Sequence, residues 1–471
     1  MTGVRTGRSE IVASFQGASS GSRKMTWGQL GMWMMFQRAW PRNDALSLAD
    51  LVEVPSNVPH EAVAASLLRV IERHEGLRTI YEAVEMDQRP RSTALGEGTL
   101  RIPIYSFPQS TSSVMESGLL ESILAEQTSV PFALESELPV RAAIIESNAN
   151  RWVALTVCHI AADSYALRIV RDEIQQNLAT NKPDLPQVEP NPPQPNDIAA
   201  FEESTEGQLR NSRALDYWRR ALQRVPVIPD SDNSSPQDKL GLGVASFVSP
   251  ASALAAFRLA ALHKVSASSA YLAAFSAVLS HSLGQPIAAM QIVFNNRTSR
   301  ELRASVACLA QGGLFVLDTD TKHFSDLLKQ SHIGALRAYS SARYDSSQRN
   351  EVVDEIGRVT GQNFDLRTII SDDLFGIEES RLTAADASRS SLDHIATASS
   401  FTWRDSHDVA VERLFLHMSS QSGVARFDVK ADLRFFARSQ VESILRTTEA
   451  VLVTACGRDG SPSDLVSLTG S

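Results

Sequence analysis

The residues best suited to chemistry in this chain are a histidine and an aspartate four positions apart. His159 follows an apolar run, Trp152 to Val157, that is long enough to cross a sheet. Asp163 follows a turn of small residues, and a helical pattern begins at Tyr165. An imidazole at the end of a rigid strand can serve as a base near neutral pH, because the pKa of an unperturbed histidine is about 6.5.

The same spacing also fits a structural role. In a chain with ten histidines, roughly half a His-x-x-x-Asp match is expected by chance. The structural alternative is a core histidine whose ring is hydrogen-bonded by a nearby carboxylate. Cys158 precedes His159, but neighbouring strand residues point to opposite faces, which argues against a thiol–imidazole pair. We therefore interpret Cys158 as a small buried hydrophobic residue.

Other catalytic signatures are absent from the sequence. It contains no Gly-x-Gly-x-x-Gly after a strand, no Gly-Lys-Ser/Thr loop, no His-Glu-x-x-His and no Gly-x-Ser-x-Gly. Its three cysteines, Cys158, Cys308 and Cys456, are widely spaced. We therefore expect no disulfide framework, no metal and no bound cofactor, and a reducing, cytoplasmic location.

Length and charge narrow the class of protein further. The 471 residues are too many for one compact core, which favours two domains. The net charge is -9, which gives no electrostatic case for nucleic acid or an anionic membrane. The least charged long stretch, Val265 to Met290, is interrupted by serines and a glycine, so it predicts a buried helix rather than a membrane span.

Helical and strand patterns alternate along both halves, which favours an α/β or α+β fold. An amphipathic helix is expected from Pro59 to about Gly76. The other predicted helices span residues 25–37, 116–127, 165–178, 209–224, 252–262, 266–281, 324–339 and 439–455. The predicted strands span residues 50–54, 78–81, 101–106, 139–145, 152–157, 287–294, 312–319, 409–418 and 424–433.

The clearest domain boundary is a proline-rich segment. Residues 181–196 contain six prolines, which cannot form a helix interior or a central strand. We expect a disordered leader over residues 1–24, an N-terminal lobe over 25–180, a linker over 181–197 and a C-terminal lobe over 198–471.

Several motifs together resemble those of a known family. CHIAADS, Cys158 to Ser164, resembles the His-His-x-x-x-Asp-Gly core of nonribosomal peptide synthetase condensation domains. Its His-x-x-x-Asp part also resembles the wider acyltransferase superfamily of chloramphenicol acetyltransferase and the plant BAHD enzymes. Other family-like segments follow in order: TWGQLGMW (26–33), RHEGLRTIY (73–81), PFALESELPVRAAI (131–144), NNRTSRE (295–301) and GGLFVLDT (312–319). The resemblance implies two chloramphenicol-acetyltransferase-like lobes in a V-shaped pseudo-dimer.

The resemblance also implies roles for the site residues. His159 matches the family's catalytic histidine, which would lie in a tunnel between the lobes. Asp163 would be ion-paired to an arginine of the second lobe, for which Arg297 is the candidate, and would fix the turn. Cys158 replaces the first histidine of the pair, and Ser164 replaces a glycine. If that glycine requires a positive φ, serine there costs about 1 kcal/mol.

The implied function is transfer of an acyl group from a carrier-protein phosphopantetheine thioester to an amine. The sequence contains no Leu-Gly-Gly-x-Ser carrier motif and no adenylation motif, so we expect a freestanding enzyme that meets its carrier in trans. Docking of an acidic carrier would require a local basic patch. Arg337, Arg343 and Arg349 are candidates for it.

The replaced residues Cys158 and Ser164 leave other functions open. One is an ester-forming or coenzyme A-dependent acyltransferase, which would need no carrier. Another is a carrier-tethered cyclisation or dehydration. A third is a condensation-like module that docks a partner without catalysis.

Overall fold

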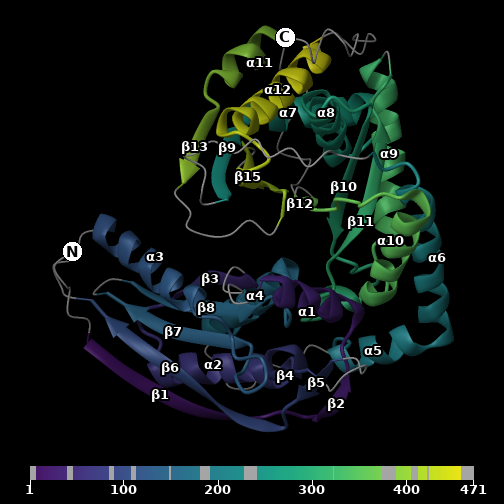
Figure 1. Ribbon diagram of the computed structural model, residues 1–471. Coiled ribbons are helices and arrows are strands. Elements are labelled where there is room, and N and C mark those ends of the chain that lie inside the picture. The colour runs from purple at the N-terminus through teal and green to yellow at the C-terminus, as the bar shows by residue number, and fades with distance from the viewer. Residues whose placement is uncertain are drawn as a thin grey trace. The chain divides into compact units, whose positions relative to one another are not determined.

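The computed structural model describes most of the chain (Figure 1). The described residues are 7–39, 46–83, 90–107, 113–147, 150–180, 191–226, 241–321, 323–373, 389–404, 412–421 and 424–457. They form two compact units. The first comprises Met1–Arg210, Asn295–Ala310 and Asp345–Ser347, and the second comprises Asn211–Phe294, Gln311–Tyr344 and Gln348–Ser471.

The first unit is built on a five-stranded sheet of order β1-β6-β7-β8-β3. Its strands are β1 (Gly7–Gln16), β6 (Glu97–Ser106), β7 (Val140–Glu146), β8 (Arg151–Cys158) and β3 (Ser47–Val54). Helices α2 (His60–Arg73) and α4 (Ser164–Thr180) pack on one face, and α3 (Ser113–Ser129) packs on the other. β8 lies between two neighbours and is covered on both faces, which explains its unbroken apolar sequence.

Smaller elements of the first unit surround this core. A three-stranded sheet contains β2 (Gly21–Lys24), β5 (Arg91–Ala94) and β4 (Thr79–Glu82). The helical segments are α1 (Trp27–Ala39), η2 (Glu75–Arg78), α5 (Pro195–Glu203) and η3 (Leu302–Ala304).

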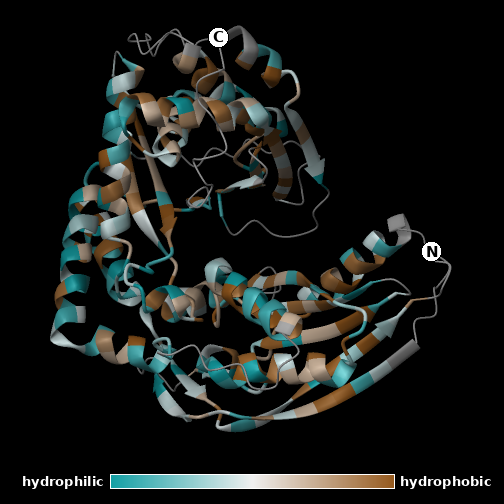
Figure 2. Ribbon diagram, turned by 180° about the vertical axis from the view of Figure 1, so that it is seen from behind, coloured by the Kyte–Doolittle hydropathy of each residue, from teal (hydrophilic) through white to brown (hydrophobic). Residues whose placement is uncertain are grey.

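The second unit is built on a seven-stranded sheet of order β11-β10-β12-β14-β15-β9-β13. Its strands are β9 (Leu242–Ser249), β10 (Ile287–Phe294), β11 (Gln311–Asp318), β12 (Thr368–Asp372), β13 (Ser400–Arg404), β14 (Leu414–Gln421) and β15 (Val424–Asp432). One face of this sheet packs against a group of helices through a large cluster of buried apolar residues. These helices are α7 (Pro250–His263), α8 (Ala267–Ser282), α9 (Phe324–Ser340), α11 (Arg389–Ala396) and α12 (Arg438–Gly457). Helices α6 (Thr205–Leu222) and α10 (Ser346–Thr360) pack on the opposite face of β10 and β11. Figure 2 shows apolar residues concentrated along the central strands and alternating with polar ones along the helices.

The structure differs from the sequence-based expectation at the N-terminus. Residues 7–16 and 21–24 form strands where a disordered leader is expected. β1 pairs with β6 over its whole length. The signal is the alternation of Ile11, Ala13 and Phe15, of which Phe15 is buried in the core. Two-residue periodicity in a short segment with several polar residues is easily mistaken for a leader.

The second difference concerns how the residues divide between the two units. Residues 198–210, 295–310 and 345–347 belong to the first unit, although the sequence predicts them in the C-terminal lobe. In the expected linker, α5 begins at Pro195 with a capping box between Gln194 and Asp197, and residues 181–190 lie outside the described residues. Residues 409–411 of an expected strand also lie outside them, and β14 begins at Leu414.

The apolar stretch of residues 265–290 forms α8 and part of β10. Every residue of α8 from Ser268 to Ser280 is buried in the second unit, as the interruption by serines predicts. Within the described ranges, no helix is long and apolar enough to cross a bilayer.

Two glycines in helices provide a matched test of the packing around α1. A Cβ on Gly28 would lie 2.2 Å from the carbonyl oxygen of Cys308, whereas a Cβ on Gly118 in α3 would meet nothing within 4 Å. We expect Gly28→Ala to lower the free energy of unfolding by about 1–3 kcal/mol, because backbone must move. Gly118→Ala should raise it by about 0.5–1 kcal/mol, the helix-propensity gain. Urea denaturation of both variants measures the difference, and equal effects would contradict the close approach.

Candidate active site

His159 lies immediately after the last residue of β8. The strand is held by β7 on one side and β3 on the other. The backbone N–H of His159 donates to the carbonyl oxygen of Leu46 at 2.9 Å, which extends the β3 pairing by one residue. His159 is half-buried as a residue, and its Nδ1 is buried.

The turn after His159 is closed by short-range hydrogen bonds. The N–H of Ala161 donates to the carbonyl oxygen of Cys158 at 2.9 Å. Asp163 then caps α4, because its Oδ1 accepts from the N–H of Ala166 at 2.9 Å. Its carbonyl oxygen accepts from the N–H of Leu167 at 2.9 Å. A side-chain oxygen bonded to the third N–H of a helix is the usual N-cap arrangement.

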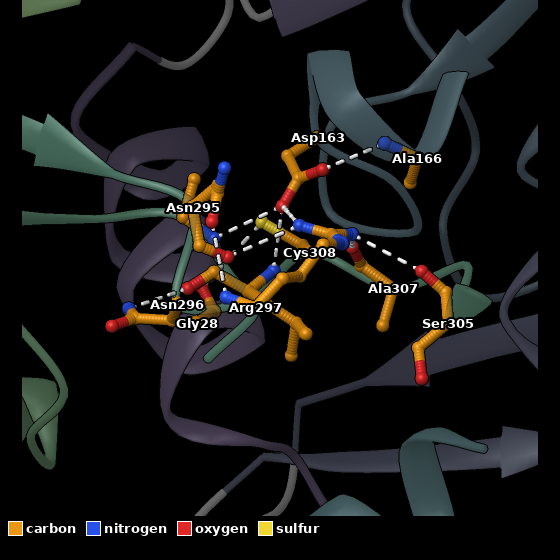
Figure 3. Close-up of polar contacts among 11 residues, drawn as sticks. Gly28, Asp163, Ala166, Asn295, Asn296, Arg297, Ser305, Ala307 and Cys308 are labelled. Atoms are coloured by element: carbon orange, nitrogen blue, oxygen red, sulfur yellow. Dashed lines mark hydrogen bonds and ion pairs between the residues drawn. The ribbon is translucent and has the colours of Figure 1, made fainter. Parts of the chain in front are cut away.

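The other carboxylate oxygen of Asp163 binds a distant segment (Figure 3). Oδ2 accepts from Nη1 of Arg297 at 2.8 Å and from the backbone N–H groups of Leu309 and Ala310, each at 3.0 Å. The side chains of Asp163 and Arg297 are both almost fully buried. The predicted ion pair is therefore present. Arg297 belongs to the first unit, however, and not to the second as expected.

Arg297 is held by backbone carbonyls as well as by Asp163. Its Nη1 donates to the carbonyl oxygen of Asn295 at 3.1 Å. Its Nη2 donates to the carbonyl oxygens of Ser305 at 3.2 Å and Ala307 at 3.0 Å. The planar guanidinium thus fastens the 295–308 segment to Asp163, a use for which arginine is better suited than lysine.

Asn296 directs the chain into this arrangement. Its φ of 57° is in the left-handed region, where asparagine is tolerated better than most residues. The buried side chain donates from Nδ2 to the carbonyl oxygen of Leu309 at 2.8 Å. Asn296, which precedes Arg297, is therefore bonded to Leu309, whose N–H binds Asp163.

The electrostatics favour an ionised Asp163. Burial alone would raise its pKa, but the charge and hydrogen bond of Arg297, with the N–H groups of Ala166 and Leu309, hold that pKa below its usual range. The carboxylate is consequently charged at neutral pH and accepts four hydrogen bonds. It is a structural anion rather than a proton donor.

The cysteines near the site are neutral thiols. Burial raises the pKa of Cys158 to about 12. Burial also raises the pKa of Cys308 well above its usual value. Cys158 is packed in an apolar cluster, which fits its interpretation as a small hydrophobic residue. That cluster contains Met25, Leu30, Phe36, Tyr81, Phe132, Cys158 and Ile160.

Ser164 occupies an unstrained position. It is the exposed first residue of α4. In the described part of the chain, Lys264 and Asn296 are the non-glycine residues with a positive φ, so Ser164 has none. The backbone cost considered for a serine at this position therefore does not arise.

The three arginines proposed for a docking patch do not form one. Arg337 is exposed on α9. Arg343 is buried, and the guanidinium of Arg349 lies over the ring of Trp218 with its Cζ 5.1 Å from the centroid. Arg343 and Arg349 thus belong to the packing of the second unit, which leaves Arg337 alone of the three as a surface cation.

Sequence reasoning missed the backbone part of the site. The N–H groups of Leu309 and Ala310 and the carbonyls of Ser305 and Ala307 bind Asp163 and Arg297. Backbone groups carry no side-chain signature, so no pattern in the sequence could have identified them. Over the ranges that the structure covers, no group of three or more His, Cys, Asp and Glu residues could hold a metal ion.

The structure thus places a strand-end histidine four residues before an aspartate that is ion-paired to an arginine, within an α/β protein of two units. The family model of the condensation domain matches residues 21–348, and the chain belongs to this family. The family is acyl-transferring and of the amide-forming kind.

Individual relatives agree with this assignment. The chain is 28% identical over 299 residues to nonribosomal peptide synthetase kk1B of Curvularia clavata, covering 60% of this chain and 2% of that protein. The condensation domain of the monacolin K polyketide synthase MokA matches with a TM-score of 0.71 at 14% identity, over 94% of this chain and 99% of that one. The SgcC5 protein of Streptomyces globisporus matches with a TM-score of 0.69 at 15% identity, over 94% and 100%. The structural matches confirm the two-lobe fold, and the chain spans a small fraction of the curated relative's length.

Removal of the Asp163 carboxylate should destabilise the protein strongly. Asp163→Ala would leave the charge of Arg297 buried without its partner and remove the cap of α4. We expect a loss of about 3–5 kcal/mol and little soluble protein. The matched control is Asp172→Ala on the exposed side of the same helix, with an expected change within about 0.5 kcal/mol. Soluble yield and urea midpoints measure both, and equal stability of the two variants would contradict the role of the ion pair.

Acid should weaken the folded state. Because folding lowers the pKa of Asp163, its contribution to stability is complete above the pKa of a free aspartate, about 3.9, and is lost as pH falls through the folded pKa. Asp365 and Asp428 act in the same direction. We expect the urea midpoint to fall as pH is lowered from about 5 to about 3. A midpoint that is constant or rises over this interval would show that these carboxylates do not gain from folding.

Proposed function

We propose that this chain is a condensation enzyme that transfers an acyl group from the phosphopantetheine thioester of a carrier protein to an amine. The product would be an amide, and His159 would be the base or orienting group. Membership of an acyl-transferring family supports the reaction type. The observation that carries the proposal is the buried Asp163–Arg297 ion pair, because it holds the turn that presents a half-buried imidazole.

In the proposed reaction, the amine nitrogen attacks the thioester carbonyl carbon and a C–N bond forms. His159 orients the nitrogen or accepts the proton that it loses. The tetrahedral intermediate then collapses, the C–S bond breaks, and the pantetheine sulfur leaves and takes up a proton. An amide and a free thiol are produced, and no redox change occurs.

In this mechanism the protein acts mainly by positioning the two substrates. Bringing two substrates together beside one imidazole converts a bimolecular attack into a nearly unimolecular one, which supplies several kcal/mol. Asp163 transfers no proton, because its carboxylate is buried, ionised and bonded to four donors. Cys158 is no nucleophile, because its thiol is neutral at physiological pH.

The test of this proposal is a carrier-unloading assay. An acyl-loaded carrier domain is mixed with candidate amines and either wild type or His159→Ala, and the carrier is weighed by intact-protein mass spectrometry. We expect His159→Ala to lose about 10²–10⁴-fold in rate with an unchanged unfolding midpoint, because general-base assistance is removed. His281→Ala, at the exposed end of α8, controls for the loss of a histidine.

The other possible functions give different results in the same assay. Full turnover by His159→Ala would refute the assignment of the base. Turnover of a coenzyme A thioester without carrier would show a coenzyme A-dependent enzyme, and turnover of alcohols alone would show an ester-forming one. A cyclised or dehydrated product that stays on the carrier would show a tailoring enzyme. Binding of the carrier without unloading would show a docking module.

A further inference from the structure

We propose that Tyr165 is a positioning residue for His159, acting through Arg297 and Asp163. This inference rests on the function proposed for His159. Tyr165 is the second residue of α4, immediately after the turn, and its side chain is half-buried. The Cζ of Arg297 lies 4.7 Å from the centre of its ring.

The contacts of Arg297 show why an aromatic ring belongs at this place. The two terminal nitrogens donate to Asp163 and to the carbonyls of Asn295, Ser305 and Ala307. The Nε atom is buried and has no hydrogen-bond partner in the part of the chain that the structure covers. With both terminal nitrogens occupied, the flat faces of the group remain for a further residue to contact, and an aromatic face attracts a cation.

Tyr165 thereby separates the ion pair from solvent. Arg297 is 4% exposed, whereas Tyr165 is only partly buried and also lies near Arg168, whose Cζ is 5.4 Å from the ring centre. Exclusion of water and salt strengthens a charged interaction. A weaker Asp163–Arg297 pair would loosen the turn from Cys158 to Asp163, and the imidazole of His159 would be less well oriented.

The experiment replaces the ring while leaving the catalytic residues intact. Tyr165→Leu removes the aromatic face, Tyr165→Phe keeps it, and Tyr105→Leu on β6 is the control at another half-buried tyrosine of the first unit. We expect Tyr165→Leu to lose about tenfold in kcat, with KM within about twofold and with a steeper loss of rate on raising salt. Tyr165→Phe and Tyr105→Leu should stay within about twofold of wild type.

A second readout is independent of activity. The N–H groups of Leu309 and Ala310 bind Asp163, so their hydrogen exchange reports on the ion pair. We expect exchange about tenfold faster in Tyr165→Leu and unchanged in Tyr165→Phe. If the leucine variant does not fold, Tyr165→Met replaces it with the same expectations.

The outcomes are decisive for each proposal separately. Wild-type kcat or wild-type exchange in Tyr165→Leu overturns the inference, as does a change in KM alone or an equal loss in Tyr165→Phe. If His159→Ala retains full turnover, the proposed function fails. The exchange rates at Leu309 and Ala310 then still show whether Tyr165 supports the ion pair.

Discussion

The first unit depends on one buried ion pair. Asp163 and Arg297 are 134 positions apart, and their side-chain atoms meet at 2.8 Å with almost no exposure. Burial of two charges is costly unless they are paired and their remaining donors and acceptors are satisfied. Asp163 meets that requirement with three backbone N–H groups. Arg297 meets it at its two terminal nitrogens with three backbone carbonyls, while its buried Nε has no partner among the described residues. The pair therefore binds backbone groups around both side chains. A purely apolar contact has no directional preference and could not orient these groups.

The consequence for His159 is a fixed position. β8 ends one residue before it, and Asp163 closes the turn four residues later by capping α4. The imidazole is thus carried by a segment that is fastened at both ends, while its ring remains half-buried. A side chain carried in this way has a fixed orientation, which is what the proposed reaction requires of His159.

The two departures from the family motif are accommodated by packing. Cys158 fills a place in an apolar cluster and stays protonated because burial raises its pKa. Ser164 begins α4 with an ordinary backbone conformation and an exposed side chain. Neither residue disturbs the hydrogen bonds of Asp163, so the altered motif keeps the geometry on which His159 depends.

The amino-acid sequence by itself determined the local part of this protein. The apolar run of β8, the helical pattern of α4 and the spacing of His159 and Asp163 predict the strand, turn and helix that the structure contains, because two-residue and 3.6-residue periodicities are local properties. The family motifs also pointed to Arg297 as the partner of Asp163.

Tertiary structure alone decided how that partner is held and where it belongs. The segment 295–310 joins the first unit although β10 and β11, which flank it in sequence, belong to the second. Its hold on Asp163 uses the N–H groups of Leu309 and Ala310, and its hold on Arg297 uses the carbonyls of Ser305 and Ala307. Every residue has these backbone groups, so their partners are chosen by the fold and leave no trace in the order of side chains.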